Sequence, residues 1–219
     1  DLATGMVGEF PELQGIMGRY YALHDGEPAV VADAIAEHYL PRYAGDRLPD
    51  SPVSCAVALA DKLDTVIGIF GAGTVPTGDK DPFALRRHAL GVIRILAEKQ
   101  LPLDTGALLK MAHDNFPAGT LIAAHDRSGV SIPNPVAARL FVDERAKSYL
   151  RELGYSALEV ESVLSLSPKP MEYVRRLDAT RKFLTLPESA GLAEADKRIR
   201  NILAKSDGSS VAEAASESG

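Results

Sequence analysis

Cationic side chains gather where a glycine-containing loop meets the expected start of a helix, over residues 78–87. Lys80 lies in the loop, Asp81 is the expected N-cap with a proline directly after it, and Arg86 and Arg87 fall in the first turns. Backbone N–H groups at a helix N-terminus and arginine side chains both bind phosphate. The stretch therefore predicts a phosphate-binding site. A capped surface helix whose arginines pair with nearby carboxylates would use the same residues.

A second set of residues has the types that hold a metal ion. The doublet His24-Asp25, followed later by Asp61, resembles the pattern of the HD phosphohydrolases, in which a divalent metal activates water for attack on a phosphate ester. No histidine precedes His24 in this sequence, and Gly26 and Pro28 indicate a helix end there. We therefore expect no metal site, and keep a metal-dependent phosphohydrolase using these three residues as an alternative.

The elements that would position these side chains are expected to be helices. Apolar residues recur at helical spacing, and no segment alternates as a strand does. The expected helices are a pair within 1–25, then 28–40, 51–70, 82–99, 104–116 and 134–153, one from Ser156, and two that open at Pro170 and Pro187. A long loop is expected over 117–134.

The helix expected over 51–70 should be central and largely buried, because nearly every residue in it is apolar or small. Asp61 and Asp64 lie three residues apart on it, with Lys62 expected to point elsewhere. A carboxylate on a buried helix has to be ion-paired, hydrogen-bonded or metal-bound. Arg19 and Arg42 are the ion-pair partners that we consider for these carboxylates.

Composition limits the class of protein. The chain has 219 residues, 46% of them hydrophobic and 25% charged, which is typical of a globular protein. No apolar run reaches the length of about 18 residues that a membrane span needs. The single cysteine, Cys55, lies in an apolar segment and predicts a buried thiol in a reducing compartment.

Charge is unevenly distributed along the chain. The formal net charge is −6, which is unusual for a protein that binds nucleic acid by itself. Residues 139–205 are mildly basic and include a second candidate surface for RNA, formed by Arg175, Arg176, Arg181 and Lys182.

Four motifs in the same order resemble the beta subunit of the bacterial heterotetrameric glycyl-tRNA synthetase. They are ELQGIMGRYYALHDGE, EHYLPRYAGDRLP, ALADKLDT and GDKDPFALRR, and NILAKS at 201–206 extends the resemblance. Since that subunit is several times longer, the resemblance implies an internal piece of it. The implied fold is all-α: an HD-domain-like helical bundle over 1–130 and a C-terminal helical linker region over 131–205. The polar composition of 206–219 predicts a disordered tail.

The resemblance implies a part in glycine–tRNA ligation without catalysis by this piece. In that family the alpha subunit handles glycine and ATP, with Mg as the metal of the whole enzyme, and the beta subunit recognises glycine tRNA. The implied partners are the tRNA, the alpha subunit and the remaining beta-subunit domains, in the cytoplasm, and we expect no cofactor in this piece.

The candidate tRNA contacts are cationic residues in or near the matched motifs. They are Arg42, Lys62, Lys80, Arg86 and Arg87. Salt bridges within the protein are the alternative role for each of them. A purely structural packing module is a further alternative for the whole piece. It predicts exposed apolar area and no affinity for RNA.

Overall fold

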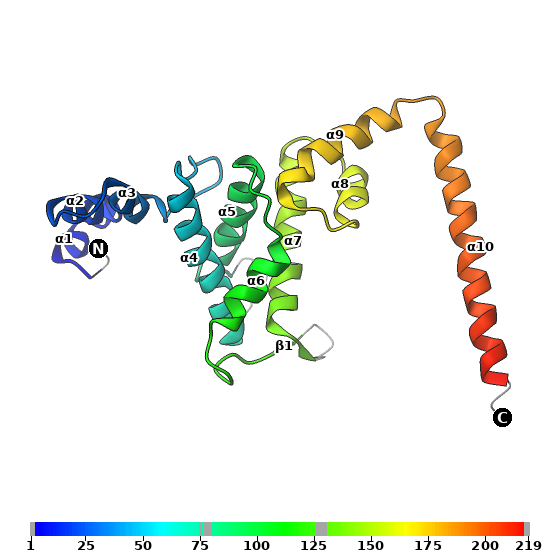
Figure 1. Cartoon of the computed structure of the whole chain (residues 1–219), viewed down its shortest axis with the longest axis horizontal. Helices are drawn as coiled ribbons and strands as arrows, with labels where there is room; N and C mark the ends of the chain where they lie inside the picture. The colour runs from blue at the N-terminus through cyan, green and yellow to red at the C-terminus, as the bar shows by residue number, and fades with distance from the viewer. Residues whose placement is uncertain (1–2, 75, 77–79, 126–130, 217–219) are drawn as a thin grey trace. The chain divides into compact units, whose positions relative to one another are not determined.

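Nearly all of the regular secondary structure in the described residues is helical. The computed structural model describes residues 3–74, 76, 80–125 and 131–216 (Figure 1). The first half contains α1 (Gly5–Glu9), the 3-10 turn η1 (Pro11–Leu13), α2 (Ile16–His24), α3 (Ala29–Glu37), α4 (Pro52–Gly71), α5 (Leu85–Glu98) and α6 (Thr105–Asp114). The second half contains α7 (Asn134–Glu152), α8 (Ala157–Leu164), the 3-10 turn η2 (Pro170–Glu172), α9 (Tyr173–Leu184) and α10 (Ser189–Ser216). The expected all-α class is confirmed.

One short strand pair interrupts the loop expected over 117–134. β1 (Ala124–His125) and β2 (Ser131–Ile132) pair antiparallel, with Ala124 opposite Ile132. Two residues on each side give no alternation that a sequence pattern could reveal, because a period of two needs several residues to show.

The chain divides into two compact units, Asp1–Val174 and Arg175–Gly219. The residues on both sides of position 130 therefore lie in one compact unit, and the domain boundary expected there stays a prediction. In the second unit α10 continues to Ser216, past the position at which we expected a disordered tail. The helical spacing of Leu192, Ile199, Ile202 and Leu203 predicts a buried apolar face, but each of these side chains is more than half exposed.

Helix α4 is the centre of the first unit, as its composition predicts. It packs against α3, α5, α6 and α7 (Figure 1). Its buried stripe includes Cys55, Leu59, Val66 and Phe70, each no more than 4% exposed. The Ser51 hydroxyl accepts a hydrogen bond from the N–H of Ser54 at 3.0 Å, which confirms the expected cap. This helix fixes the positions of the surrounding elements.

Helix α5 begins three residues later than expected. Residues 82–84 form a turn, and Ala84 at the N-cap has a left-handed backbone with φ of 54°. Asp81 still caps the helix from a distance, since its carboxylate accepts the N–H groups of Leu85 at 2.8 Å and Arg86 at 3.0 Å. Phe83 consequently lies outside the helix and is 47% exposed.

Candidate functional site

Three of the five predicted RNA-contacting side chains line one small pocket in the first unit. Arg42 comes from the loop after α3, Lys62 from α4, and Arg87 from the first turn of α5. The pocket has a volume of about 120 Å³, and its other lining residues are Tyr39, Pro41, Ala84 and His88. None of the described residues that line the pocket is a carboxylate. We call this set of seven residues the cationic pocket.

Lys62 is the buried member of the cationic pocket, with only 2% of its surface exposed. Its ammonium donates a hydrogen bond of 2.9 Å to the carbonyl oxygen of His38, the C-cap residue of α3. That carbonyl has no partner within its own helix, and a cation at a helix C-terminus is electrostatically favourable. Burial lowers the pKa of Lys62 from 10.5 to about 8, opposed by the nearby charge of Asp61. At pH 7 the side chain is therefore still a cation.

Gly91 on α5 makes room for the Lys62 side chain. A Cβ atom at position 91 would lie 2.8 Å from Cε of Lys62 and 3.0 Å from its Cδ, closer than carbon atoms approach one another. The absence of a side chain at this one position lets the lysine pass between α4 and α5 to reach His38.

The two arginines at the cationic pocket are exposed. Arg42 donates from Nη2 to the carbonyl oxygen of Gln14 at 3.3 Å, and its backbone N–H donates to Asp46. Within the described parts of the chain the Arg87 guanidinium has no carboxylate partner. The salt bridges that we considered as the alternative role are therefore not formed by Arg42 or Arg87 there.

His88 lines the cationic pocket without adding charge at pH 7. Burial, and then the charge of Lys62, lower the pKa of His88 below its usual 6.5. Its Nδ1 is buried and has no hydrogen-bond partner among the described residues. The His88 ring therefore adds no charge to the three cations of the pocket.

The other two predicted contacts do not line the cationic pocket. Lys80 and Arg86 are absent from its lining, Lys80 being exposed and Arg86 half-buried. The predicted use of backbone N–H groups at this helix start is wrong in part. The Asp81 carboxylate already occupies the first two of these groups, and Ala84 accepts the next two. Any anion bound here is therefore held by side chains.

The carboxylates expected on the buried face of α4 lie instead on its exposed face. Asp61 and Asp64 are both exposed, whereas Lys62 between them is buried. Arg19 pairs with Asp33 at 2.6 Å and so is not their partner. Lys62 lies three residues after Leu59 and four before Val66, so all three lie on one face of the helix. That spacing is the signal in the sequence that could have revealed the burial of Lys62.

The residues of the metal alternative lie at the surface. His24 ends α2 and Asp25 is its C-cap, as the glycine and proline after them predict, and both are exposed. Within residues 3–74, 76, 80–125 and 131–216, no three His, Cys, Asp or Glu side chains gather where they could hold a metal ion. His24, Asp25 and Asp61 therefore do not form such a group.

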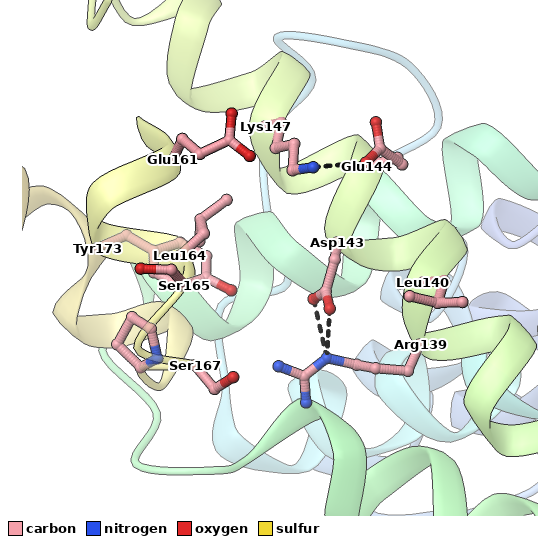
Figure 2. A pocket seen from close by; sticks show the side chains of 11 residues that line it. Arg139, Leu140, Asp143, Glu144, Lys147, Glu161, Leu164, Ser165, Ser167 and Tyr173 are labelled. Atoms are coloured by element: carbon pink, nitrogen blue, oxygen red, sulfur yellow. Dashed lines mark hydrogen bonds and ion pairs between the residues drawn. The ribbon is translucent and has the colours of Figure 1, made fainter. Parts of the chain in front are cut away.

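A larger pocket of about 250 Å³ differs from the cationic pocket in its charge. It lies between one face of α7 and helix α8, and Figure 2 shows Asp143 pointing to the Arg139 guanidinium and Lys147 pointing to Glu144. The Nε of Arg139 donates to both carboxylate oxygens of Asp143, at 2.8 and 2.9 Å. With Glu161, three carboxylates face two cations, so this pocket does not favour an anion.

A third hollow, of about 540 Å³, is mainly apolar and lies between α4 and α6. Leu103 and Met111 line it and are 40% and 63% exposed, and Asp61 and Asp64 also line it. We call it the α4–α6 groove. Its apolar lining indicates a surface for packing rather than for binding an anion.

The described helices give no sign of a membrane span, because none combines the necessary length with sufficient apolar character.

The comparisons with known proteins agree with the motifs. The family model described as glycyl-tRNA synthetase beta subunit matches residues 1–165. The glycine–tRNA ligase beta subunit of Janthinobacterium sp. (strain Marseille) is 54% identical over 214 residues, which are 97% of this chain and 29% of that protein. The beta subunit of Thiobacillus denitrificans is 55% identical over 95% of this chain and 28% of its own length.

A third relative gives the same coverage. The beta subunit of Polaromonas naphthalenivorans is 58% identical over 94% of this chain and 27% of its own length. The chain thus spans less than a third of the curated relatives that it matches. With a family model over most of its residues and more than half of the aligned positions identical, the chain belongs to the glycyl-tRNA synthetase beta subunit family.

Proposed function

We propose that this chain binds the backbone of glycine tRNA as part of the beta subunit of a glycine–tRNA ligase. The relatives are named as beta subunits of that ligase, which supports a role in the ATP-dependent attachment of glycine to its tRNA. Catalysis, with ATP and Mg, would take place outside this chain, in the alpha subunit. We also propose that the first unit corresponds to the HD-like bundle implied by the family.

One observation carries the proposal. Arg42, Lys62 and Arg87 come from three separate elements and meet at one pocket, and no carboxylate is found among the described residues that line it. Convergent cations without a carboxylate are suited to an oxyanion, and phosphate is the group that proteins contact most often on a nucleic acid. The net charge of −6 disfavours RNA elsewhere on the surface and so makes a local cationic site necessary.

The test is binding to glycine tRNA across a salt series. The parent is compared with an Arg42→Ala, Arg87→Ala double variant and with a control double variant, Lys110→Ala, Arg151→Ala, which removes the same charge from exposed positions elsewhere. Each lost phosphate contact should reduce the slope of log affinity against log salt by about 1. We expect a lower affinity for glycine tRNA and a smaller salt slope only in the Arg42→Ala, Arg87→Ala variant. Equal behaviour of the two double variants would contradict the proposal.

A purely structural packing role is the second candidate, and the α4–α6 groove favours it. An apolar groove of about 540 Å³ with exposed Leu103 and Met111 is the kind of surface that another part of a longer subunit covers. We propose the remaining beta-subunit domains as the occupant, since the relatives are more than three times as long as the matched region. Met111→Glu should then prevent those domains from assembling with this one, and the parent chain should show no affinity for glycine tRNA at low salt.

A further inference from the structure

We propose that the cationic pocket binds a terminal phosphate monoester of RNA, at its 5′ end, rather than a phosphodiester within the chain. This inference depends on the RNA-binding function proposed above and specifies which phosphate is bound.

The size of the cationic pocket is the first argument. Its volume of about 120 Å³ is well below the roughly 300–1,000 Å³ of pockets that take whole small molecules, and equals about four water molecules. One phosphoryl group fits such a space, but a nucleoside does not. An internal phosphodiester carries a sugar on each side and would have to bring both to the pocket. A terminal phosphate is attached through one oxygen and can enter alone.

Charge is the second argument. An internal phosphodiester carries one negative charge, whereas a phosphate monoester carries about −1.5 to −2 at pH 7 and has three free oxygens. Arg42, Lys62 and Arg87 supply three cationic groups to the same pocket. Three donors around one group match three free oxygens and two charges better than they match the two free oxygens of a diester.

The burial of Lys62 is the third argument. Among the described residues its ammonium has one acceptor, the neutral carbonyl of His38, although it carries three N–H donors. Asp61, the nearest influence of opposite charge, is exposed and does not line the pocket. A buried cation without a charged partner is costly, and a doubly charged phosphate would compensate for it more completely than a singly charged one.

The experiment compares two forms of one RNA. Glycine tRNA with its 5′-monophosphate and the same tRNA with a 5′-hydroxyl are titrated with the whole chain at one fixed ionic strength. One or two charge-assisted hydrogen bonds predict a preference of about tenfold or more for the phosphorylated form. The preference should disappear in Arg87→Ala, an exposed position where folding is not at risk, and should persist in the control Lys110→Ala.

The outcomes separate the two claims. If the parent binds both RNAs equally while Arg42→Ala, Arg87→Ala weakens both, the chain binds RNA backbone and the terminal-phosphate assignment is wrong. If the double variant binds both RNAs as the parent does, or if the parent binds neither at low salt, the proposed function fails as well. A free nucleoside 5′-monophosphate is the competitor in a third arm. If it displaces the phosphorylated tRNA as effectively as the 5′-phosphorylated tRNA itself does, the pocket serves a small nucleotide and the RNA assignment is overturned.

Discussion

At the scale of single residues, Lys62 accounts for most of what is unusual in this chain. A lysine with 2% exposure is rare. The His38 carbonyl accepts a hydrogen bond from this ammonium, and Gly91 leaves room for its side chain. Because its folded pKa of about 8 lies below the ordinary 10.5, the unfolded chain binds more protons than the folded chain between these values. Stability due to Lys62 is therefore gained as the pH rises through that window.

The Lys62→Met variant tests this linkage. Met is of similar length and carries no charge, so its stability should not follow this titration. Between pH 7 and about pH 9.5 the parent should gain about 2 kcal/mol of unfolding free energy relative to the variant. Tyr149 and Tyr173, whose pKa values burial raises from 10 to about 12, oppose the trend only at higher pH and do so in both proteins. Urea unfolding of both proteins at the two pH values measures this gain in unfolding free energy. An equal difference between parent and variant at both pH values would show that the pKa of Lys62 is not lowered by folding.

A methyl group at position 91 should disturb the same lysine. In Gly91→Ala the new Cβ would meet Cε of Lys62 at 2.8 Å, so the side chain must leave its path to His38. Since the clash is with a flexible side chain, we expect a loss of about 1–2 kcal/mol rather than misfolding. Binding of glycine tRNA should weaken as well. Gly191→Ala serves as a control for RNA binding, because a Cβ there also meets nothing within 4 Å and the position lies outside the cationic pocket. Unchanged RNA affinity in Gly91→Ala would separate Lys62 from the binding site.

At the scale of elements, the starts of helices show how far local sequence determines the fold. Ser51, Asp104 and Ser156 each cap the helix that the sequence predicts, and Glu159 completes the capping box with Ser156. These signals involve residues no more than three apart, which is why they can be read from sequence alone. The start of α5 could not be predicted in this way, because a turn separates Asp81 from the N–H groups of Leu85 and Arg86 that its carboxylate accepts.

Asp81→Ala should therefore affect both stability and binding. It leaves the N–H groups of Leu85 and Arg86 without their acceptor, which costs about 1–2 kcal/mol for a helix cap. Since Arg87 lies in the same turn, fraying of that turn should also lower the affinity for tRNA. Urea midpoints and the tRNA titration report the two effects. The control Asp64→Ala removes an exposed carboxylate from α4, and a loss of equal size there would contradict the capping role.

The cationic pocket itself shows what sequence reasoning lacks. Charge and motif selected Arg42, Lys62 and Arg87, but selected Lys80 and Arg86 equally. The distinction depends on contacts between residues distant in sequence, such as Lys62 with His38, 24 positions away. The helical spacing of α7 predicts an apolar stripe that includes Leu140, and this prediction is wrong for a related reason. Its buried residues include the small Ala138 and Ala146, whereas the larger Leu140 is 56% exposed, because close packing against neighbouring helices selects size as well as hydrophobicity.

At the scale of the whole molecule, the two units differ in how they are stabilised. The first has a core of fully buried side chains from α4, α5 and α7, such as Ile67, Ile95 and Leu150. In the second, the large apolar side chains described on α10 are exposed, namely Leu192, Ile199, Ile202 and Leu203, so this part of the helix depends on its own backbone hydrogen bonds. The periodicity of α10 predicts an apolar face, but no pattern within one chain can identify what covers it.

Hydrogen exchange should reveal this difference. Amides of α4 and α5 should exchange at rates set by global unfolding, whereas those of α10 should exchange orders of magnitude faster through local opening. Mass spectrometry of peptides after exchange measures both in one sample. Comparable protection in α10 would show that its apolar face is covered in solution. Repeating the measurement over a range of protein concentrations would then tell whether a second copy covers it.

The contact between Gly91 and Lys62 also restricts the order in which these positions can change during evolution. A side chain at position 91 displaces the lysine and lowers stability, so a smaller residue at position 62 makes a change at position 91 less costly. Replacing Lys62 first frees the space beside position 91 but removes one of the three cations of the cationic pocket. The two positions should therefore vary together among relatives, with lysine at the first favouring glycine at the second.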